Sequence, residues 1–281
     1  MDYLCIDTSN LLYRLFYGAH GAGSWMDRVG AALMGLPPNL VRLTERFAPC
    51  SPVFLFDAPP YKRSGIYPDY KSGRETEADD ERGEAKVSLK RATTRLGKEV
   101  LNAVGFVNIH ARAGYEADDL CGAVRNGLAD GDRCILVTGD RDVYQLLDHR
   151  CAVYDPQRDK FVTANSFRAE FGIEPKQWVD VKALAGCDTD GVAGCPGVAE
   201  KTAIKYVRNE IPTTHKIYAD ILGFTRCGGV TQNAELVELP FPGLGPITPV
   251  PQAAPDAAAW GRYYAAFGFP APVDPRRSAR G

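Results

Sequence analysis

Acidic side chains recur in short, glycine-containing stretches of this chain, where carboxylates could act together. The stretch TGDRDVYQLL places Asp140 and Asp142 shortly after the apolar run at residues 134–137. Turns favour Asp and Gly, so one such stretch alone would indicate only a loop. Similar settings hold seven more acids, which favours a shared role: Asp7, Asp57, Glu116, Asp118, Asp119, Asp188 and Asp190.

Carboxylates gathered at one place predict a site for divalent cations. Like charges at short range raise one another's pKa and destabilise a fold unless cations neutralise them. Oxygen ligands favour Mg²⁺ or Mn²⁺ over zinc. Two such cations about 3.5 to 4 Å apart stabilise the attacking and the leaving oxygen of an in-line phosphoryl displacement. The acids therefore predict phosphodiester hydrolysis with two Mg²⁺ ions per site, with Mn²⁺ as the alternative metal.

The elements that must position these acids are short apolar runs alternating with longer helical stretches. The runs cover residues 3–6, 53–56, 106–109, 134–137 and 152–154. Their alternation predicts an α/β fold with a central, mostly parallel sheet flanked by helices. Asp7, Asp57 and Asp140 each follow a run, and the carboxyl ends of parallel strands meet at one edge of a sheet. We therefore expect these three acids to line that edge.

Composition restricts the class of protein. The 281 residues suffice for one large domain with a smaller appendage, and the net charge of -2 excludes a uniformly basic nucleic-acid binder. The eight cysteines include no C-x-x-C pair, which favours reduced thiols without a zinc site. No apolar run approaches the roughly 18 residues that span a bilayer, and no apolar signal core follows the start. We expect a soluble, cytoplasmic protein without a membrane partner.

Three further regions have their own patterns. Residues 61–98 hold basic and acidic blocks before a stretch in which Leu89, Ala92, Leu96 and Val100 share one helical face. This pattern predicts a helix with a basic surface, and the alternative is an ordinary solvated outer face. Residues 166–210 are helical with a glycine-rich interruption. Nine of the 20 prolines fall in the last 42 residues, which predicts extended surface chain with one short helix near residues 260–267.

In order along the chain, CIDTSNLLYRLFYG, LFDAPPYKRSGIYPDYKSGR, GYEADDLCG, VTGDRDVYQLL and LAGCDTDGVAGCPGVAEKTA resemble the 5′-nuclease, or flap endonuclease, family. That family includes the 5′-nuclease domain of bacterial DNA polymerase I and phage 5′-3′ exonucleases. The resemblance covers roughly residues 1–210. It implies a PIN-like catalytic domain at residues 1–165 with a helical arch at about 72–98, a helix-three-turn-helix (helix-hairpin-helix) DNA-binding subdomain at 166–239, and a Pro-rich tail at 240–281.

The resemblance also implies roles for single residues. It makes all nine acids metal ligands, with Asp7, Asp57 and the Glu-Asp motif mainly on one ion and the later aspartates mainly on the second. Tyr70 and Lys71 look like the family's Tyr-Lys pair, in which the aromatic ring stacks on a base and the lysine stabilises the phosphate. Arg14 and Arg74 are similar to basic residues that contact the substrate.

The segment GVAGCPGVAEKTA resembles the family's DNA-binding hairpin. Glycines there allow close backbone approach to a duplex phosphate, and a potassium ion often assists in relatives. The residues implied in DNA binding, together with two lysines of the arch, are Gly194, Gly197, Val198, Lys201, Thr202, Lys86 and Lys90.

One departure from the family pattern concerns the second metal. Bacterial relatives usually read G-D-x-x-D where this chain reads Gly186-Cys187-Asp188-Thr189-Asp190. Either Cys187 replaces the first acid and Asp190 is the second, or Asp188 is the ligand. A thiol is a poor ligand for Mg²⁺, so the second metal site is the weaker prediction.

The sequence thus predicts a monomeric, metal-dependent 5′-3′ exonuclease and flap endonuclease that acts on DNA with 5′ flaps or 5′ ends next to duplex, in replication, primer removal or repair. A phage origin would place it in the host cytoplasm. A PIN-like ribonuclease is an alternative, although YPDYK and the hairpin glycines argue against it. A branched-DNA-binding protein with weak or lost cleavage is the other, because of Cys187.

Overall fold

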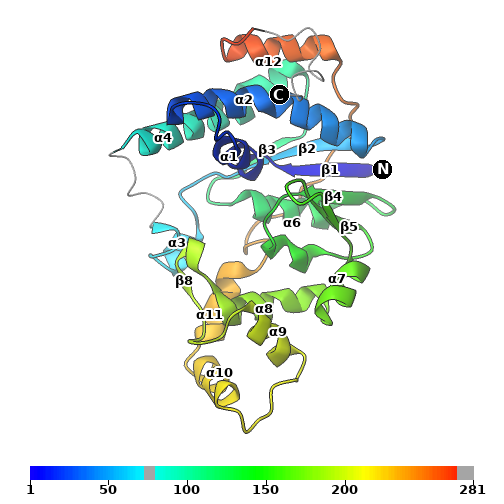
Figure 1. Ribbon diagram of the computed structural model, residues 1–281. Helices are drawn as coiled ribbons and strands as arrows, with labels where there is room; N and C mark the ends of the chain where they lie inside the picture. Colours follow the sequence, from blue (N-terminus) through cyan, green and yellow to red (C-terminus); the bar gives the residue numbers. More distant parts are fainter. Residues whose placement is uncertain (73–79, 271–281) are drawn as a thin grey trace.

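The computed structural model describes residues 1–72 and 80–270. Its centre is a six-stranded sheet in the order β3-β2-β1-β4-β5-β6 (Figure 1). Five strands are parallel and the edge strand β6 is antiparallel to β5. The strands are β1 (Asp2–Asp7), β2 (Ser51–Phe56), β3 (Ile109–Ala111), β4 (Arg133–Val137), β5 (Cys151–Asp155) and β6 (Lys160–Val162). The predicted α/β class with a mostly parallel sheet is confirmed.

The third strand differs from its prediction. The apolar run at residues 106–109 predicted a strand from Phe106, but β3 begins only at Ile109. Phe106 instead packs against β2 on the face that α2 (Trp25–Arg46) and α12 (Trp260–Ala266) cover, with its ring centroid 4.6 Å from that of Phe54. Periodicity cannot separate a short buried strand from an apolar loop segment that fills the core, which explains the shifted start.

Helices cover both faces of the sheet, so its central strands are buried on both sides. Leu4, Ile6 and Phe54 point to one face. That face is covered by α1 (Thr8–Gly18), α2 (Trp25–Arg46), α4 (Glu81–Arg95), a π-helical turn (Leu96–Val100), α5 (Leu101–Val104) and α12 (Trp260–Ala266). Cys5 and Leu55 point to the other face. That face is covered by α6 (Ala117–Gly127), a 3₁₀ turn (Asp142–Leu146), α7 (Ala164–Phe171) and α8 (Trp178–Ala185).

A smaller helical layer that starts at α8 lies at the bottom of Figure 1. A 3₁₀ turn (Pro175–Gln177) leads into α8, which is followed by the hairpin of β7 (Gly186–Cys187) and β8 (Val192–Ala193) around a 3₁₀ turn (Asp188–Asp190). The remaining helices are α9 (Glu200–Val207), α10 (Lys216–Arg226) and α11 (Gly229–Val237). The short helix α3 (Arg63–Ile66) lies between this layer and the sheet (Figure 1).

The described part of the predicted arch is a helix that packs on its neighbours. Asp80 caps α4 by accepting a hydrogen bond from the backbone N–H of Gly83 at 2.7 Å. Ala85 and Leu89 are fully buried in the core that α4 shares with α2. Residues 73–79, with the predicted substrate contact Arg74, lie outside the described residues. The arch itself therefore stays a prediction.

The segment from Leu239 to Ala266, here called the C-terminal strap, returns from the lower layer to the top of the molecule (Figure 1). Its backbone bonds to α6 through Ile247 N–H and Ala123 C=O at 2.9 Å, and to Asn108 through Val250 N–H at 2.9 Å. A 3₁₀ turn (Ala257–Ala259) leads into α12. Extended chain and a short helix are present as predicted, but the prediction of a surface position is wrong for Ile247, Trp260 and Tyr263, which are buried in the core. The end of the predicted tail, residues 271–281, lies outside the described residues. Among the described residues, no helix combines the length and the apolar character needed to cross a membrane.

Candidate metal centre and nucleic-acid interface

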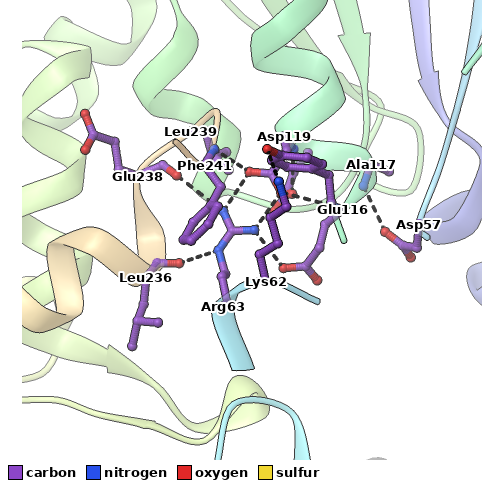
Figure 2. Close-up of polar contacts among 12 residues, drawn as sticks. Asp57, Lys62, Arg63, Glu116, Ala117, Asp119, Leu236, Glu238, Leu239 and Phe241 are labelled. Carbon is purple, nitrogen blue, oxygen red and sulfur yellow. Dashed lines mark hydrogen bonds and ion pairs between the residues drawn. The ribbon is translucent and has the colours of Figure 1, made fainter. Parts of the chain in front are cut away.

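The first two acids lie at the carboxyl ends of neighbouring strands, as predicted. Asp7 ends β1 and caps α1, since its Oδ1 accepts a hydrogen bond from Asn10 N–H at 2.9 Å. Its Oδ2 accepts a second bond from the Thr138 hydroxyl at 3.1 Å. Asp57 follows β2 and accepts a bond from Ala117 N–H at 2.9 Å, which ties it to the start of α6 (Figure 2). Backbone groups therefore fix both carboxylates before any ligand binds.

Three more acids lie at the start of α6. Glu116 is the N-cap residue, and its N–H donates to Asp119 Oδ2 at 3.0 Å in a reciprocal capping box. Ligand oxygens of Glu116, Asp118 and Asp119 all lie within 4.8 Å of one another, the spacing of a cation site. A helix N-terminus also favours negative charge, because its free N–H groups point at the carboxylates.

Asp119 differs from its two neighbours in having no free acceptor capacity. Its side chain is fully buried. Oδ1 accepts from Arg63 and from Phe241 N–H, both at 2.7 Å, and Oδ2 accepts from Arg63 at 2.6 Å and from Glu116 N–H. A carboxylate has about four lone-pair positions, and these four bonds use them. The structure thus places this predicted metal ligand in a buried ion pair.

The later acids follow β4 and the β7–β8 hairpin. Asp140 is exposed, and its Oδ1 accepts a bond from Asp142 N–H at 2.9 Å. Asp142 lies deeper and forms an ion pair with Lys182 of α8 at 2.8 Å. Asp190 is connected to the same region through its carbonyl, which accepts a bond from Lys71 N–H at 2.9 Å.

The Cys187 segment holds both candidates for the second metal. Asp188 is exposed in the 3₁₀ turn of the hairpin. Cys187 is half-buried, and burial followed by the charges of Asp190 and Asp142 raises the pKa of its thiol. Its Sγ lies 3.1 Å from the hydroxyl oxygen of Thr189. Asp140 is exposed like Asp188, so exposure does not exclude Asp188 as a ligand, and both alignments stay predictions.

The carboxylates fall into two electrostatic classes. Burial and then Asp57 raise the pKa of Asp7 to about 8. Burial also raises the pKa of Asp57 and of Asp118, and the negative charge of Glu116 raises both pKa values further. Within the described residues, none of these three carboxylates forms an ion pair. Lys71 opposes the shift at Asp57, and Arg63 and Lys71 oppose it at Asp118, but burial and the neighbouring carboxylates outweigh them. A bound divalent cation would neutralise the remaining excess of negative charge.

The second class already has cationic partners in the protein. Burial alone would raise the pKa of Glu116, but Lys71 and Arg63 outweigh it and lower that pKa. Burial and Asp140 raise the pKa of Asp142 to about 6, although Lys182 opposes them. Arg63 and Lys182 therefore set the charge balance of the site. The sequence did not predict either residue to be part of it. Their only sequence signal is position, next to LFDAPPYK and just before the Gly-Cys-Asp segment.

The predicted substrate-contacting residues lie beside the acids. The hydroxyl of Tyr70 donates to Glu116 at 2.6 Å, and Lys71 forms an ion pair with the same carboxylate. Arg14 pairs with Asp155 at 3.2 Å, and its guanidinium lies against Gly139, which precedes Asp140. Lys71 and Arg14 therefore lie beside the carboxylate group, whereas Tyr70 is buried with Val192 and Leu236 and reaches the group only through its hydroxyl.

The predicted DNA-binding residues occupy two distant places. Gly194 is packed so closely against Ala185 that a side chain could not fit, and Gly197 has a φ of 77°, which favours glycine. Val198 is buried, whereas Lys201 and Thr202 lie on the first turn of α9, with Lys201 exposed. Lys86 and Lys90 lie on α4, at the opposite end of the molecule (Figure 1).

Comparison with curated proteins shows relatives among the DNA polymerases. The chain is 30% identical over 207 residues to the thermostable DNA polymerase I of Thermus thermophilus, which covers 73% of this chain and 24% of the polymerase. It is 32% identical over 214 residues to DNA polymerase I of Mycobacterium tuberculosis, which covers 73% of this chain and 22% of the polymerase. The chain thus spans about a quarter of the length of these relatives.

Solved structures share the fold at low sequence identity. The bacteriophage T5 5′-exonuclease with bound zinc has a TM-score of 0.68 at 17% identity, over 85% of this chain and 90% of the other. Human GEN1 in complex with Holliday junction DNA has a TM-score of 0.57 at 17% identity, over 95% and 68% of the two chains. A family model described as 5′-3′ exonuclease, N-terminal resolvase-like domain, matches residues 2–172, which include the first seven predicted metal ligands. This chain therefore belongs to the 5′-3′ exonuclease family.

Proposed function

We propose that the protein is a metal-dependent 5′-3′ exonuclease and structure-specific flap endonuclease that hydrolyses phosphodiesters in DNA. The observation that carries the proposal is the group of Asp7, Asp57 and Asp118, whose pKa values are raised and which have no ion-pair partner among the described residues. Such a group is costly unless a divalent cation binds it. Family membership and the T5 flap endonuclease, solved with DNA and metal ions, give support.

The two cations would bind at different parts of the acid group. Asp7, Asp57 and Asp118 would hold the first, with Glu116 beside them. Asp140, Asp142 and Asp190 would hold the second, at the place that Cys187 weakens. Their all-oxygen chemistry fits Mg²⁺, with Mn²⁺ as the alternative. Bound Mg²⁺ would supply charge neutralisation and a more acidic water for phosphodiester hydrolysis.

Protein side chains would do the remaining work. Lys71 would move from its pair with Glu116 toward the scissile phosphate, and Tyr70 would hold the carboxylate in place. The hairpin around Gly194 and Gly197 would present backbone N–H groups to a duplex phosphate, with K⁺ as a possible aid and Lys201 nearby. Every acid of the group comes from one chain, so a single copy would suffice for catalysis.

The test is cleavage of a 5′-labelled DNA flap duplex in Mg²⁺ by the wild type and by Asp140→Asn. Asp130→Asn is the matched control, because Asp130 is exposed in the loop between α6 and β4. We expect the wild type and the control to cut near the junction between single strand and duplex, and Asp140→Asn to lose at least about 100-fold in rate, in the range of removing one charge-stabilising group.

The same assay separates the alternatives. A wild type that binds the flap but does not cut it in Mg²⁺ or in Mn²⁺ would instead support a branched-DNA-binding protein whose second metal site is broken at Cys187. Faster cleavage of an RNA duplex of the same structure would support a PIN-like ribonuclease.

A further inference from the structure

Arg63 is a buried cation that joins two parts of the protein. Its Nε donates to the carbonyl of Leu236 at 2.7 Å, and one Nη donates to the carbonyl of Glu238 at 3.3 Å. The two Nη groups also donate to Asp119, and one of them donates to Glu116 at 3.1 Å (Figure 2). The side chain is only 2% exposed. Every nitrogen of the guanidinium therefore has a partner.

The partners of Arg63 belong to two different elements. The carbonyls of Leu236 and Glu238 are at the end of α11, in the lower helical layer. The carboxylates of Glu116 and Asp119 are at the start of α6, against the sheet. Figure 2 shows the guanidinium between these two elements. A shift of α11 relative to α6 would therefore move the guanidinium that is hydrogen-bonded to Glu116.

The end of α11 is in turn connected to the hairpin. The amide of Asn233, in the middle of α11, donates to the carbonyls of Ala183 and Ala193, both at 2.9 Å. Ala193 belongs to β8, directly before Gly194 of the candidate DNA-binding hairpin. The hydrogen bonds of Asn233, the backbone of α11 and the hydrogen bonds of Arg63 thus connect the hairpin to Glu116.

The charge pattern explains why this residue is an arginine. Buried positive charge next to two carboxylates is stable only with well-aligned hydrogen bonds. Arg63 makes the planar two-point contact with Asp119, and its remaining donors reach Glu116 and two carbonyls. An ammonium group has three donors without a planar fork, so lysine could not reproduce this set.

We propose that Arg63 is a positioning residue that couples the duplex-binding hairpin to Glu116, and that Asp119 is its counter-ion and not a ligand of a cation. The proposal rests on the proposed function. It means that engagement of duplex DNA at the hairpin adjusts the carboxylate group at which cations bind, although Arg63 itself touches neither the substrate nor the metal.

The first test uses the double variant Arg63→Met with Asp119→Asn, which removes both buried charges and keeps an oxygen that can accept from a backbone N–H, so that the cost in stability is limited. Mg²⁺ affinity is measured by calorimetry with and without a flap duplex that carries phosphorothioates across the junction. Linkage between two sites typically amounts to 5- to 150-fold in affinity. The quantity compared is the Mg²⁺ affinity with the flap duplex divided by the Mg²⁺ affinity without it. We expect this ratio to be at least about fivefold smaller in the double variant than in the wild type, while the Mg²⁺ affinity without DNA changes less than about threefold.

The control is Arg125→Met, which breaks the ion pair of Arg125 and Asp148 elsewhere on α6 and should keep the wild-type ratio. The second test is Arg63→Lys, in which we expect the single-turnover cleavage rate to fall about 100-fold, as for a misplacement of about 1 Å, with DNA affinity in EDTA nearly unchanged. An unchanged affinity ratio in the double variant would overturn the coupling. Loss of Mg²⁺ binding without DNA would overturn the counter-ion role of Asp119.

These readouts also separate this proposal from the proposed function. A wild type that binds Mg²⁺ and flap DNA with mutual dependence but never cuts would refute the nuclease and retain the coupling.

Discussion

Raising the pH should destabilise the metal-free protein, and Asp7 should account for a large part of the effect. Its pKa of about 8 in the folded state compares with a usual value of 3.8. Between these two values the folded protein retains a proton that the unfolded chain has lost. The contribution of Asp7 to the free energy of unfolding is therefore fully present below about pH 4 and is lost as the pH rises toward 8. A salt-bridged carboxylate would behave in the opposite way.

The size of the effect follows from proton linkage. One proton difference changes the free energy of unfolding by about 1.4 kcal/mol per pH unit. Over the two pH units from 5.5 to 7.5, Asp7 should therefore contribute a loss on the order of 2 to 3 kcal/mol. Asp57 and Asp118 act in the same direction, because burial raises their pKa as well.

The assay is urea unfolding in EDTA at pH 5.5 and 7.5, for the wild type and Asp7→Asn. The asparagine keeps an oxygen for the bonds from Asn10 N–H and the Thr138 hydroxyl but cannot titrate. Between pH 5.5 and 7.5, we expect the free energy of unfolding to fall by about 2 to 3 kcal/mol less in the variant than in the wild type. Saturating Mg²⁺ should stabilise the wild type more at pH 7.5, because the cation displaces the retained protons. Equal losses in the two proteins would refute the electrostatic account.

Three other substitutions test separate parts of the structure. Cys187→Asp adds a carboxylate facing Asp142 and Asp190, and should lower the Mg²⁺ concentration for half-maximal cleavage by at least about tenfold, or about 1.4 kcal/mol; an unchanged midpoint would show that the thiol does not lie at a metal site. Lys201→Ala should weaken binding to duplex of any sequence and reduce the slope of log Kd against log salt by about 0.9, as measured by fluorescence anisotropy; an unchanged slope would mean that Lys201 makes no phosphate contact. Trp260→Ala should lower the free energy of unfolding by about 3 to 5 kcal/mol in urea, because this strap residue is 3% exposed and packs on Phe106; a change below about 1 kcal/mol would mean that the strap is not part of the core.

The sequence predicted the part of the site that depends on strand topology. Asp7 and Asp57 follow apolar runs, and parallel strands place such residues at one edge whatever the details of packing. Cys187 and Asp188 could not be separated in this way. The hairpin pairs Gly186 with Ala193 and Cys187 with Val192, and strands of two residues have no periodicity from which the direction of a side chain could be predicted.

Asp119 and Arg63 show a different limit of the sequence. Glu116 and Asp119 are three residues apart, which correctly predicted that they lie close together at the start of a helix. Spacing does not show which of the two carboxylates will be used up by an ion pair with a buried cation. Arg63 lies in a stretch rich in basic residues, where most side chains are solvated, and composition cannot single out the one that is 2% exposed.

The division of the acids follows from where the protein supplies its own positive charge. Arg63, Lys71 and Lys182 each approach a carboxylate from the side of the lower layer or of the segment that precedes the arch. The carboxylates at the sheet edge, led by Asp7 and Asp57, form no ion pair among the described residues, although the charge of Lys71 lowers the pKa of Asp57. Burial and the neighbouring carboxylates outweigh it and raise the pKa of both, so a divalent cation gains most by binding at this edge. The cationic side chains lower the repulsion around this place, so that a site with many acids can fold before metal arrives.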